Sequence, residues 1–153
     1  MNRFFVLFVS AAVMWTAAAE APSAEQMAMR AKLYGIGEGL ATAVSLSSRP
    51  NHVSDNIQHY AVNGLRVEMY KPDLGNYILP VSVETTTPAV LRAINHDLPE
   101  MSGETFIGQF GEPDSHTANS LHYRGMAEIC SDYMDIGLKD GKVASISWTF
   151  CSD

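Results

Sequence analysis

The chain has 153 residues, with 10 Lys and Arg against 17 Asp and Glu, which gives a formal net charge of −7 at pH 7. A chain this acidic, without a cluster of basic residues, is repelled by nucleic-acid phosphates and anionic lipid. We therefore expect no nucleic-acid partner and no stable membrane insertion. The expected partner is another protein, and a basic one is compatible with this charge.

The first 19 residues have the three parts of a secretory signal. Arg3 is followed by an apolar run from Phe4 to Trp15, and small residues end at Ala19. The run is about 12 residues long, shorter than the ~20 that a membrane-spanning helix needs. Cleavage after Ala19 leaves 153 − 19 = 134 residues, one exported domain over 20–153, with a charge of 9 − 17 = −8. Because no N-glycosylation sequon is present, we expect the bacterial periplasm or exterior.

Ser23 and Gln26 form a capping box that predicts the start of a helix. The following residues have helical spacing but include Gly35, Gly37 and Gly39, each costing ~1 kcal/mol inside a helix. The sequence therefore predicts one interrupted helix, or two short ones, ending before Arg49 and Pro50.

Residues 51–63 are polar and without a pattern, so we expect mostly loop, with a short strand near 60–62. Apolar and polar residues then alternate over 65–70, which predicts a half-buried strand. A turn over 71–76 leads to a second strand over 77–84, where Pro80 indicates an edge or a bulge. These two strands should form an antiparallel hairpin.

Pro88 is placed to begin a short helix over 89–95. Ser102 opens another helix, which should stop at Gly111, and residues 114–119 are expected as loop before a strand at 121–123. The predicted fold class is α+β, with N-terminal helices packed on a small antiparallel sheet that ends in a disulfide-clipped C-terminal hairpin.

Asp140-Gly141 lies between two apolar-rich runs, which predicts a tight hairpin with strands at about 133–139 and 142–150. A two-residue turn makes paired positions sum to 281 and sets Cys130 opposite Cys151. A three-residue loop shifts the sum to 280 and collects the apolar side chains on one face, but leaves the cysteines one residue out of register. Either turn keeps both sulfurs close, so an oxidising compartment predicts a Cys130–Cys151 disulfide.

Candidate chemistry is sparse. His116 and His122 flank one predicted loop and, with Asp114, offer a possible metal set, although zinc sites usually have closer ligand spacing. No nucleophile elbow is present, and a chain of this length contains trios such as Ser120, His122 and an acid by chance. We therefore expect no enzyme, no catalytic residue, no metal and no cofactor.

The C-terminal half resembles a known family. A helix closing with Phe110-Gly111-Glu112-Pro113, a strand at Leu121-His122-Tyr123 and a hairpin reading from Gly141 to Trp148 are similar to the small exported SmpA/OmlA (BamE-like) domains. Those domains share a fold with the β-lactamase-inhibitor proteins. The resemblance covers residues 101–150 and implies a helix-plus-sheet module that binds other proteins and has no active site.

These observations predict a periplasmic or secreted protein-binding module, such as an inhibitor or immunity protein for an envelope-acting enzyme. Tyrosines are natural anchors for such a contact, and the candidates are Tyr70, Tyr77, Tyr123 and Tyr133. One alternative is a small exported hydrolase or metal-dependent enzyme using His116 and His122. Another is an envelope-assembly scaffold.

Overall fold

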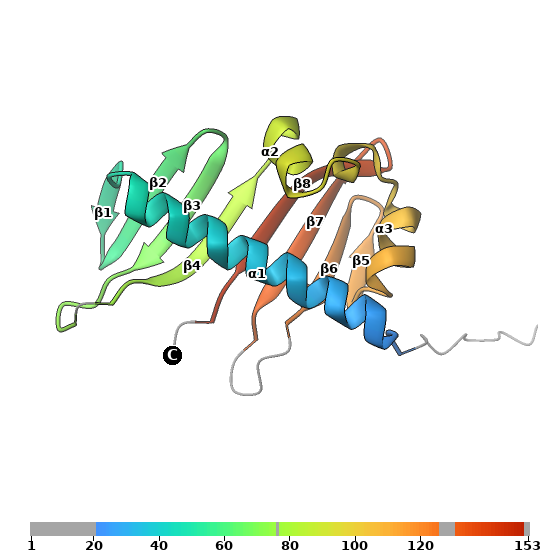
Figure 1. The fold of residues 1–153 in the computed structure, drawn as a ribbon, viewed down its shortest axis with the longest axis horizontal. Coiled ribbons are helices and arrows are strands. Elements are labelled where there is room, and N and C mark those ends of the chain that lie inside the picture. Colours follow the sequence, from blue (N-terminus) through green and yellow to red (C-terminus); the bar gives the residue numbers. More distant parts are fainter. Residues whose placement is uncertain (1–20, 76, 126–130, 152–153) are drawn as a thin grey trace, which may run out of the picture.

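The described part of the chain, residues 21–75, 77–125 and 131–151 of a computed structural model, contains one eight-stranded antiparallel sheet (Figure 1). The strand order is β1-β2-β3-β4-β8-β7-β6-β5. The first four strands are β1 (His52–Ser54), β2 (Ile57–Val62), β3 (Leu65–Tyr70) and β4 (Leu79–Thr85). The last four are β5 (Ser115–Thr117), β6 (Ser120–Arg124), β7 (Tyr133–Lys139) and β8 (Lys142–Thr149). The predicted α+β class with an antiparallel sheet is confirmed.

The sheet consists of two similar halves. Strands β1 to β4 form one meander after helix α1 (Ala24–Ser47), and β5 to β8 form a second meander after helix α3 (Gly103–Phe110). The two meanders join through their last strands, because β4 pairs with β8. The sequence shows no internal repeat, so this repetition becomes visible only in the strand order.

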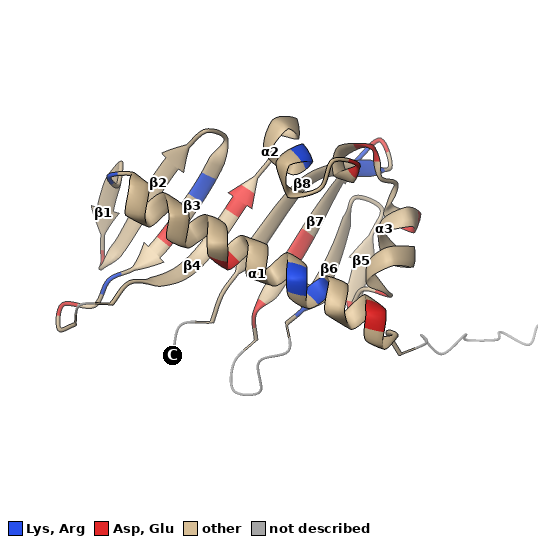
Figure 2. Ribbon diagram, viewed as in Figure 1, with Lys and Arg blue, Asp and Glu red and all other residues tan. Residues whose placement is uncertain are grey.

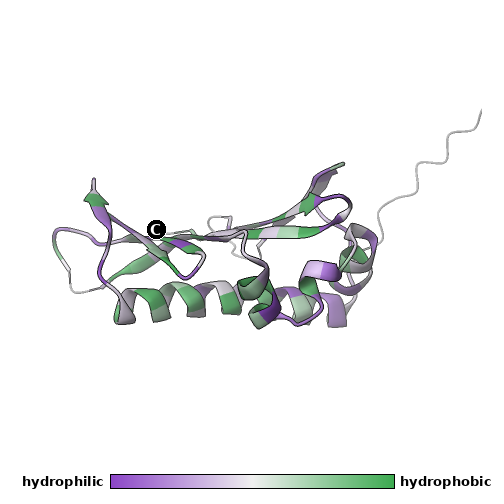
Figure 3. Ribbon diagram, turned by 90° about the horizontal axis from the view of Figure 1, so that it is seen from above, coloured by the Kyte–Doolittle hydropathy of each residue, from purple (hydrophilic) through white to green (hydrophobic). Residues whose placement is uncertain are grey.

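All described helices lie on one face of the sheet (Figure 3). Helix α1 runs across the strands, while α2 (Pro88–Ile94), the 3₁₀ helix η1 (Leu98–Glu100) and α3 lie between the two meanders in the chain. The expectation that the helices are N-terminal is therefore too narrow. Pro88 at the first turn of α2, the Ser102 cap of α3 and its end at Gly111 agree with the predictions.

Helix α1 is continuous, which corrects the expected interruption. The capping box is present: the Gln26 amide donates to Ser23 Oγ at 3.2 Å, and the Ser23 amide donates to Gln26 Oε1 at 2.9 Å. The buried stripe of α1 includes Gly37, which lies against the Trp148 side chain. Close packing there accounts for a glycine where propensity alone predicts a break.

The core lies between the sheet and these helices. Side chains that are fully buried come mainly from the central strands and from α3, and they include Phe106, Tyr123, Met134, Ile146 and Trp148. The predicted alternation in β3 is confirmed, since Leu65, Val67 and Met69 are buried. The opposite face of these strands has no described helix over it (Figure 3).

The β7–β8 hairpin combines features of both predicted turns. Asp140 and Gly141 have φ values of 53° and 75°, as a two-residue turn requires, and Lys139 pairs with Lys142. A register shift beyond Leu138 then pairs Ile136 with Ile146 and Met134 with Trp148. The bulge at Ala144 thus brings the apolar residues to one face without a longer loop.

Two strands form where the sequence predicts loop, and a third is longer than predicted. Strand β1, within residues 51–63, and strand β5, at residues 115–117, are not expected from the sequence, whereas the short strand expected near 60–62 is β2, which already begins at Ile57. Strand β4 lies inside the sheet between β3 and β8, and a register shift separates the Pro80 and Ser82 pairings. Of the two interpretations of Pro80, the bulge is therefore right and the edge is wrong.

Candidate functional site

The two histidines of the predicted metal or hydrolase site lie on opposite faces of the sheet. Ser115 pairs with His122, and His116 pairs with Leu121. Paired residues share a face and successive residues of a strand alternate between faces, so His116 lies on the face of the buried Leu121 and His122 lies on the other. His122 Nδ1 lies 2.6 Å from Asp135 Oδ1 on β7. Across the described ranges, no group of three or more His, Cys, Asp or Glu is arranged to hold a metal. The structure does not bring the predicted pair together.

The four candidate tyrosines differ in their surroundings. Tyr123 is wholly buried and its hydroxyl donates to the Gly111 carbonyl at 3.0 Å, so its expected role as a surface contact is wrong. Tyr77 precedes β4 and is 54% exposed. Tyr70 and Tyr133 are half-buried and lie on the strand positions that alternate with the core residues Met69 and Met134. Both therefore face away from the helices.

We call the side of the sheet away from the helices the open face. Its positions follow from the strand register and form rows that cross the sheet. One row contains Ala61, Arg66, Glu84, Ser147, Asp135, His122 and Ser115. A second contains His52, His59, Glu68, Ser82, Thr149, Tyr133 and Arg124. A third, over the first meander only, contains Ser54, Ile57, Tyr70 and Leu79.

Contacts between ionisable side chains connect neighbouring strands on the open face. Arg66 Nη2 lies 2.8 Å from Glu84 Oε2. His59 Nδ1 lies 3.2 Å from Glu68 Oε1, with exposed fractions of 35% and 43%. Exposed pairs of this kind contribute about 0–1 kcal/mol each, so they set side-chain orientation more than stability. Acidic and basic residues are interspersed along the described part of the ribbon (Figure 2).

The centre of the open face is built from small side chains. Gly137 on β7 pairs with Ser145 on β8, and a Cβ at position 137 would lie 2.1 Å from Ser145 Oγ. The residues along β8 that share this face are Ser145, Ser147 and Thr149. The middle of the face therefore has short, hydroxyl-bearing side chains, while the larger Tyr70 and Tyr133 lie on either side of it.

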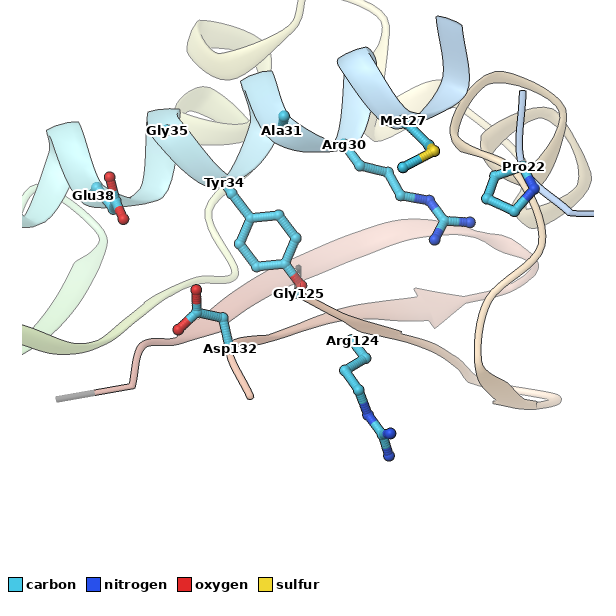
Figure 4. Close-up of a pocket in the computed structure, with 10 residues that line it drawn as sticks. All are labelled: Pro22, Met27, Arg30, Ala31, Tyr34, Gly35, Glu38, Arg124, Gly125 and Asp132. Atoms are coloured by element: carbon cyan, nitrogen blue, oxygen red, sulfur yellow. The ribbon is translucent and has the colours of Figure 1, made fainter. Parts of the chain in front are cut away.

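A cleft of about 560 Å³ lies between α1 and the ends of β6 and β7 (Figure 4). Two of its polar side chains, Arg30 and Tyr34, bind to backbone carbonyls. Arg30 donates to the backbone carbonyls of Phe110 and Glu112, and its guanidinium lies 4.6 Å from the centre of the Tyr123 ring. Tyr34 donates to the Tyr123 carbonyl at 3.0 Å. These contacts tie α1 to α3 and β6, which is a structural role.

Burial changes the acidity of the tyrosines around this cleft. It raises the pKa of Tyr34 above its ordinary value, and the Asp132 carboxylate adds to the increase. Burial also raises the pKa of Tyr123, although the Arg30 charge opposes it. Both hydroxyls therefore stay protonated at neutral pH and act as hydrogen-bond donors to backbone carbonyls.

The predicted disulfide involves a residue outside the described ranges, Cys130. Cys151 follows β8, and its amide donates to Asp132 Oδ1 at 2.7 Å. This contact fixes the end of β8 to the residue before β7. The Cys130–Cys151 bridge stays a prediction.

The part of the open face formed by β1 and the start of β2 is not predicted from the sequence. Mostly loop is expected over 51–63, with only a short strand near 60–62, although Asn63-Gly64 is a recognised hairpin signal and both residues have positive φ. That signal predicts β2 paired with β3, and the same register places His59 beside Glu68.

Comparisons with known proteins give no assignment. No protein-family model matches the chain, and no match was found among curated proteins or solved structures. Within the described residues, no helix combines the length and apolar character that a transmembrane span requires.

Proposed function

We propose that this protein is an exported binding module whose open face contacts another protein. The observation that supports this most directly is the division of the sheet: one face is covered by all the described helices, and the other has none of them over it. The open face spans both meanders and has mixed polar, charged and aromatic side chains. Such surfaces are typical of protein contacts that form and dissociate.

Tyr70 and Tyr133 are the proposed anchors of this contact. They come from different meanders, on β3 and β7, and flank the centre of the face. Aromatic residues of this kind contribute much of the affinity in protein interfaces, because a large rigid ring is buried at little entropic cost. An inhibitor or immunity protein for an envelope enzyme fits this arrangement.

The proposed partner is basic. The chain has a net charge of −7, which becomes −8 if residues 1–19 are removed, since only Arg3 is lost: 9 − 17 = −8. Opposite net charge accelerates encounter between proteins, with a strong dependence on ionic strength. The proposal therefore includes association that slows as salt is added.

Export and the disulfide belong to the same proposal. The last paired residues of the hairpin are Tyr133 and Thr149, and Cys151 lies two residues beyond. Continuing that register sets position 131 opposite Cys151, and Cys130, the next residue along the sequence, is the proposed partner in the bridge. Intact mass spectrometry of protein from its native host, with and without reductant, tests this: a bridged chain gains two hydrogens on reduction.

Binding is tested by capturing partners from the native envelope with three variants. Tyr70→Ala and Tyr133→Ala change the open face, and Leu46→Ala changes an 83% exposed residue of α1 as the matched control. Loss of a central anchor costs about 2 kcal/mol or more, roughly a 30-fold loss of affinity. We expect that loss from the tyrosine variants and none from Leu46→Ala. Equal affinity for all three would contradict the proposal.

A further inference from the structure

A serine, a histidine and a glutamate form a connected chain on the open face of the first meander. Ser54 Oγ lies 3.3 Å from His59 Nε2, and His59 Nδ1 lies 3.2 Å from Glu68 Oε1. With its proton on Nδ1, His59 donates to the glutamate and accepts from the serine. This is the order of contacts that a nucleophile, its general base and the acid that orients the base require.

The strand register brings these three residues together. Ser54 is the last residue of β1, and Asp55 and Asn56, with φ of 48° and 65°, form the turn into β2. Ser54 pairs with Ile57, so His59 lies two residues further along the same face of β2. His59 pairs in turn with Glu68 on β3. The β1–β2 and β2–β3 pairings therefore bring the three side chains together, which their spacing in the sequence does not indicate.

Neighbouring side chains hold the acid and the imidazole in place. Ser82 Oγ donates to the second carboxylate oxygen of Glu68 at 3.1 Å. The His52 ring stacks on His59 with centroids 5.6 Å apart. Glu68 therefore keeps one oxygen for His59, and the imidazole has both a fixed plane and a fixed partner. Ser54 is partly exposed and the His59 side chain is 35% exposed, so both are accessible from solvent.

We propose that Ser54, His59 and Glu68 form a site for acyl transfer from carboxylic esters. Ser54 Oγ attacks the ester carbonyl carbon while His59 Nε2 takes the hydroxyl proton. The carbon–oxygen bond to the alcohol then breaks, and the alcohol leaves with that proton. Water, activated by His59, attacks the acyl-serine, releases the carboxylic acid and restores Ser54. Glu68 is a positioning residue, since it acts through His59.

The surroundings of Ser54 indicate the class of acyl group. Ser54, Ile57, Tyr70 and Leu79 occupy one row of paired positions across β1 to β4. Ile57, Tyr70 and Leu79 are each only partly buried, so the row offers apolar surface beside the nucleophile. An apolar acyl chain that lies along this row removes part of that surface from water. We therefore infer esters with an apolar acyl chain as substrates.

The second meander supplies a natural comparison. His122 and Asp135 lie on β6 and β7 on the same face, and His122 Nδ1 is 2.6 Å from Asp135 Oδ1. They correspond to His59 and Glu68 on β2 and β3, whose Nδ1 and Oε1 are 3.2 Å apart. Among the described residues, however, no serine hydroxyl hydrogen-bonds to His122, and Ser120 contacts Thr117 instead. The histidine–acid pair is present in both halves, but within the described chain the serine contact is found only in the first.

A fluorophosphonate probe tests the nucleophile directly, because it reacts with activated serines. We expect one adduct, located at Ser54 by peptide mass spectrometry, on the full exported chain. Ser54→Ala should abolish labelling, and His59→Gln should slow it by about 10² or more. His122→Gln is the matched control and should label at the wild-type rate. No adduct at Ser54, or equal labelling of the His59→Gln and wild-type proteins, would overturn the proposal.

Hydrolysis of p-nitrophenyl acetate, butyrate and octanoate tests the substrate class and the role of Glu68. We expect kcat/KM to rise with the length of the acyl chain. The Tyr70→Ala variant should lose that rise. Glu68→Gln should lower kcat and change its pH profile between pH 5 and 8, while Glu68→Asp restores part of the rate. Circular dichroism shows whether each variant is folded. A folded Ser54→Ala protein with wild-type hydrolysis would contradict the assignment, whether or not the open face binds a protein.

Discussion

Gly37 of α1 lies directly against the indole of Trp148 on β8. A Cβ at position 37 would lie 2.7 Å from Trp148 Cγ, closer than real side-chain contacts allow. Trp148 is fully buried at the centre of the sheet, where β8 joins the two meanders. The position of α1 across the sheet therefore depends on the absence of a side chain at residue 37.

Gly37→Ala should lower the free energy of unfolding. The added methyl group forces the helix and the indole apart, and overpacking of this kind costs about 1–3 kcal/mol. Urea denaturation measures the loss. Gly35→Ala and Gly39→Ala are matched controls, since a Cβ at either position would have nothing within 4 Å of it. Alanine is the better helix former, so these variants should gain up to ~1 kcal/mol; a Gly37→Ala protein that gains as much would contradict the packing.

Arg30 joins α1 to the end of α3, and lysine should not replace it. The guanidinium donates to the Phe110 and Glu112 carbonyls together, which a single ammonium group cannot reproduce in the same geometry. We expect Arg30→Lys to lose about 1–2 kcal/mol of stability, measured by thermal unfolding. Lys32→Arg on the same helix is the control and should change stability little. Equal stability of wild type and Arg30→Lys would show that only the charge matters.

The tyrosines of the core predict a loss of stability in alkali. Burial raises the pKa of Tyr34 and of Tyr123, so the folded protein keeps protons that the unfolded chain releases above pH ~10. The contribution of these tyrosines to the free energy of unfolding is complete below that pH. It falls as the pH rises, by at most ~1.4 kcal/mol per pH unit for each tyrosine. Urea denaturation at successive pH values measures the slope. Tyr34→Phe should make it shallower, and an unchanged slope would exclude Tyr34 as a contributor.

Much of the fold follows from local sequence signals. The Ser23 capping box, the alternation in β3 and the Asp140-Gly141 turn each predict their element, because cap, period and turn depend on adjacent residues. The continuity of α1 does not follow from local signals. The low helix propensity of Gly37 is offset by packing against Trp148, which is more than one hundred positions away in the sequence. Long-range packing overrides local propensity there.

The candidate site is less predictable from the sequence. Residue type alone proposes tyrosines as contact residues, but it includes the buried Tyr123, because it does not distinguish the two faces of a strand. His59 and Glu68 meet only through the β2–β3 register. The edge strands β1 and β5 are short and mostly exposed, so neither has the apolar alternation by which strands are recognised.

The central claim is that the open face is the surface that contacts a partner. In-cell photo-crosslinking tests it most directly, with a photo-reactive phenylalanine analogue in place of Tyr133 on that face or of Leu46 on the surface of α1. We predict that the analogue at position 133 yields a discrete crosslinked protein in the native envelope and that the one at position 46 does not. Crosslinks from position 46 alone would contradict the claim.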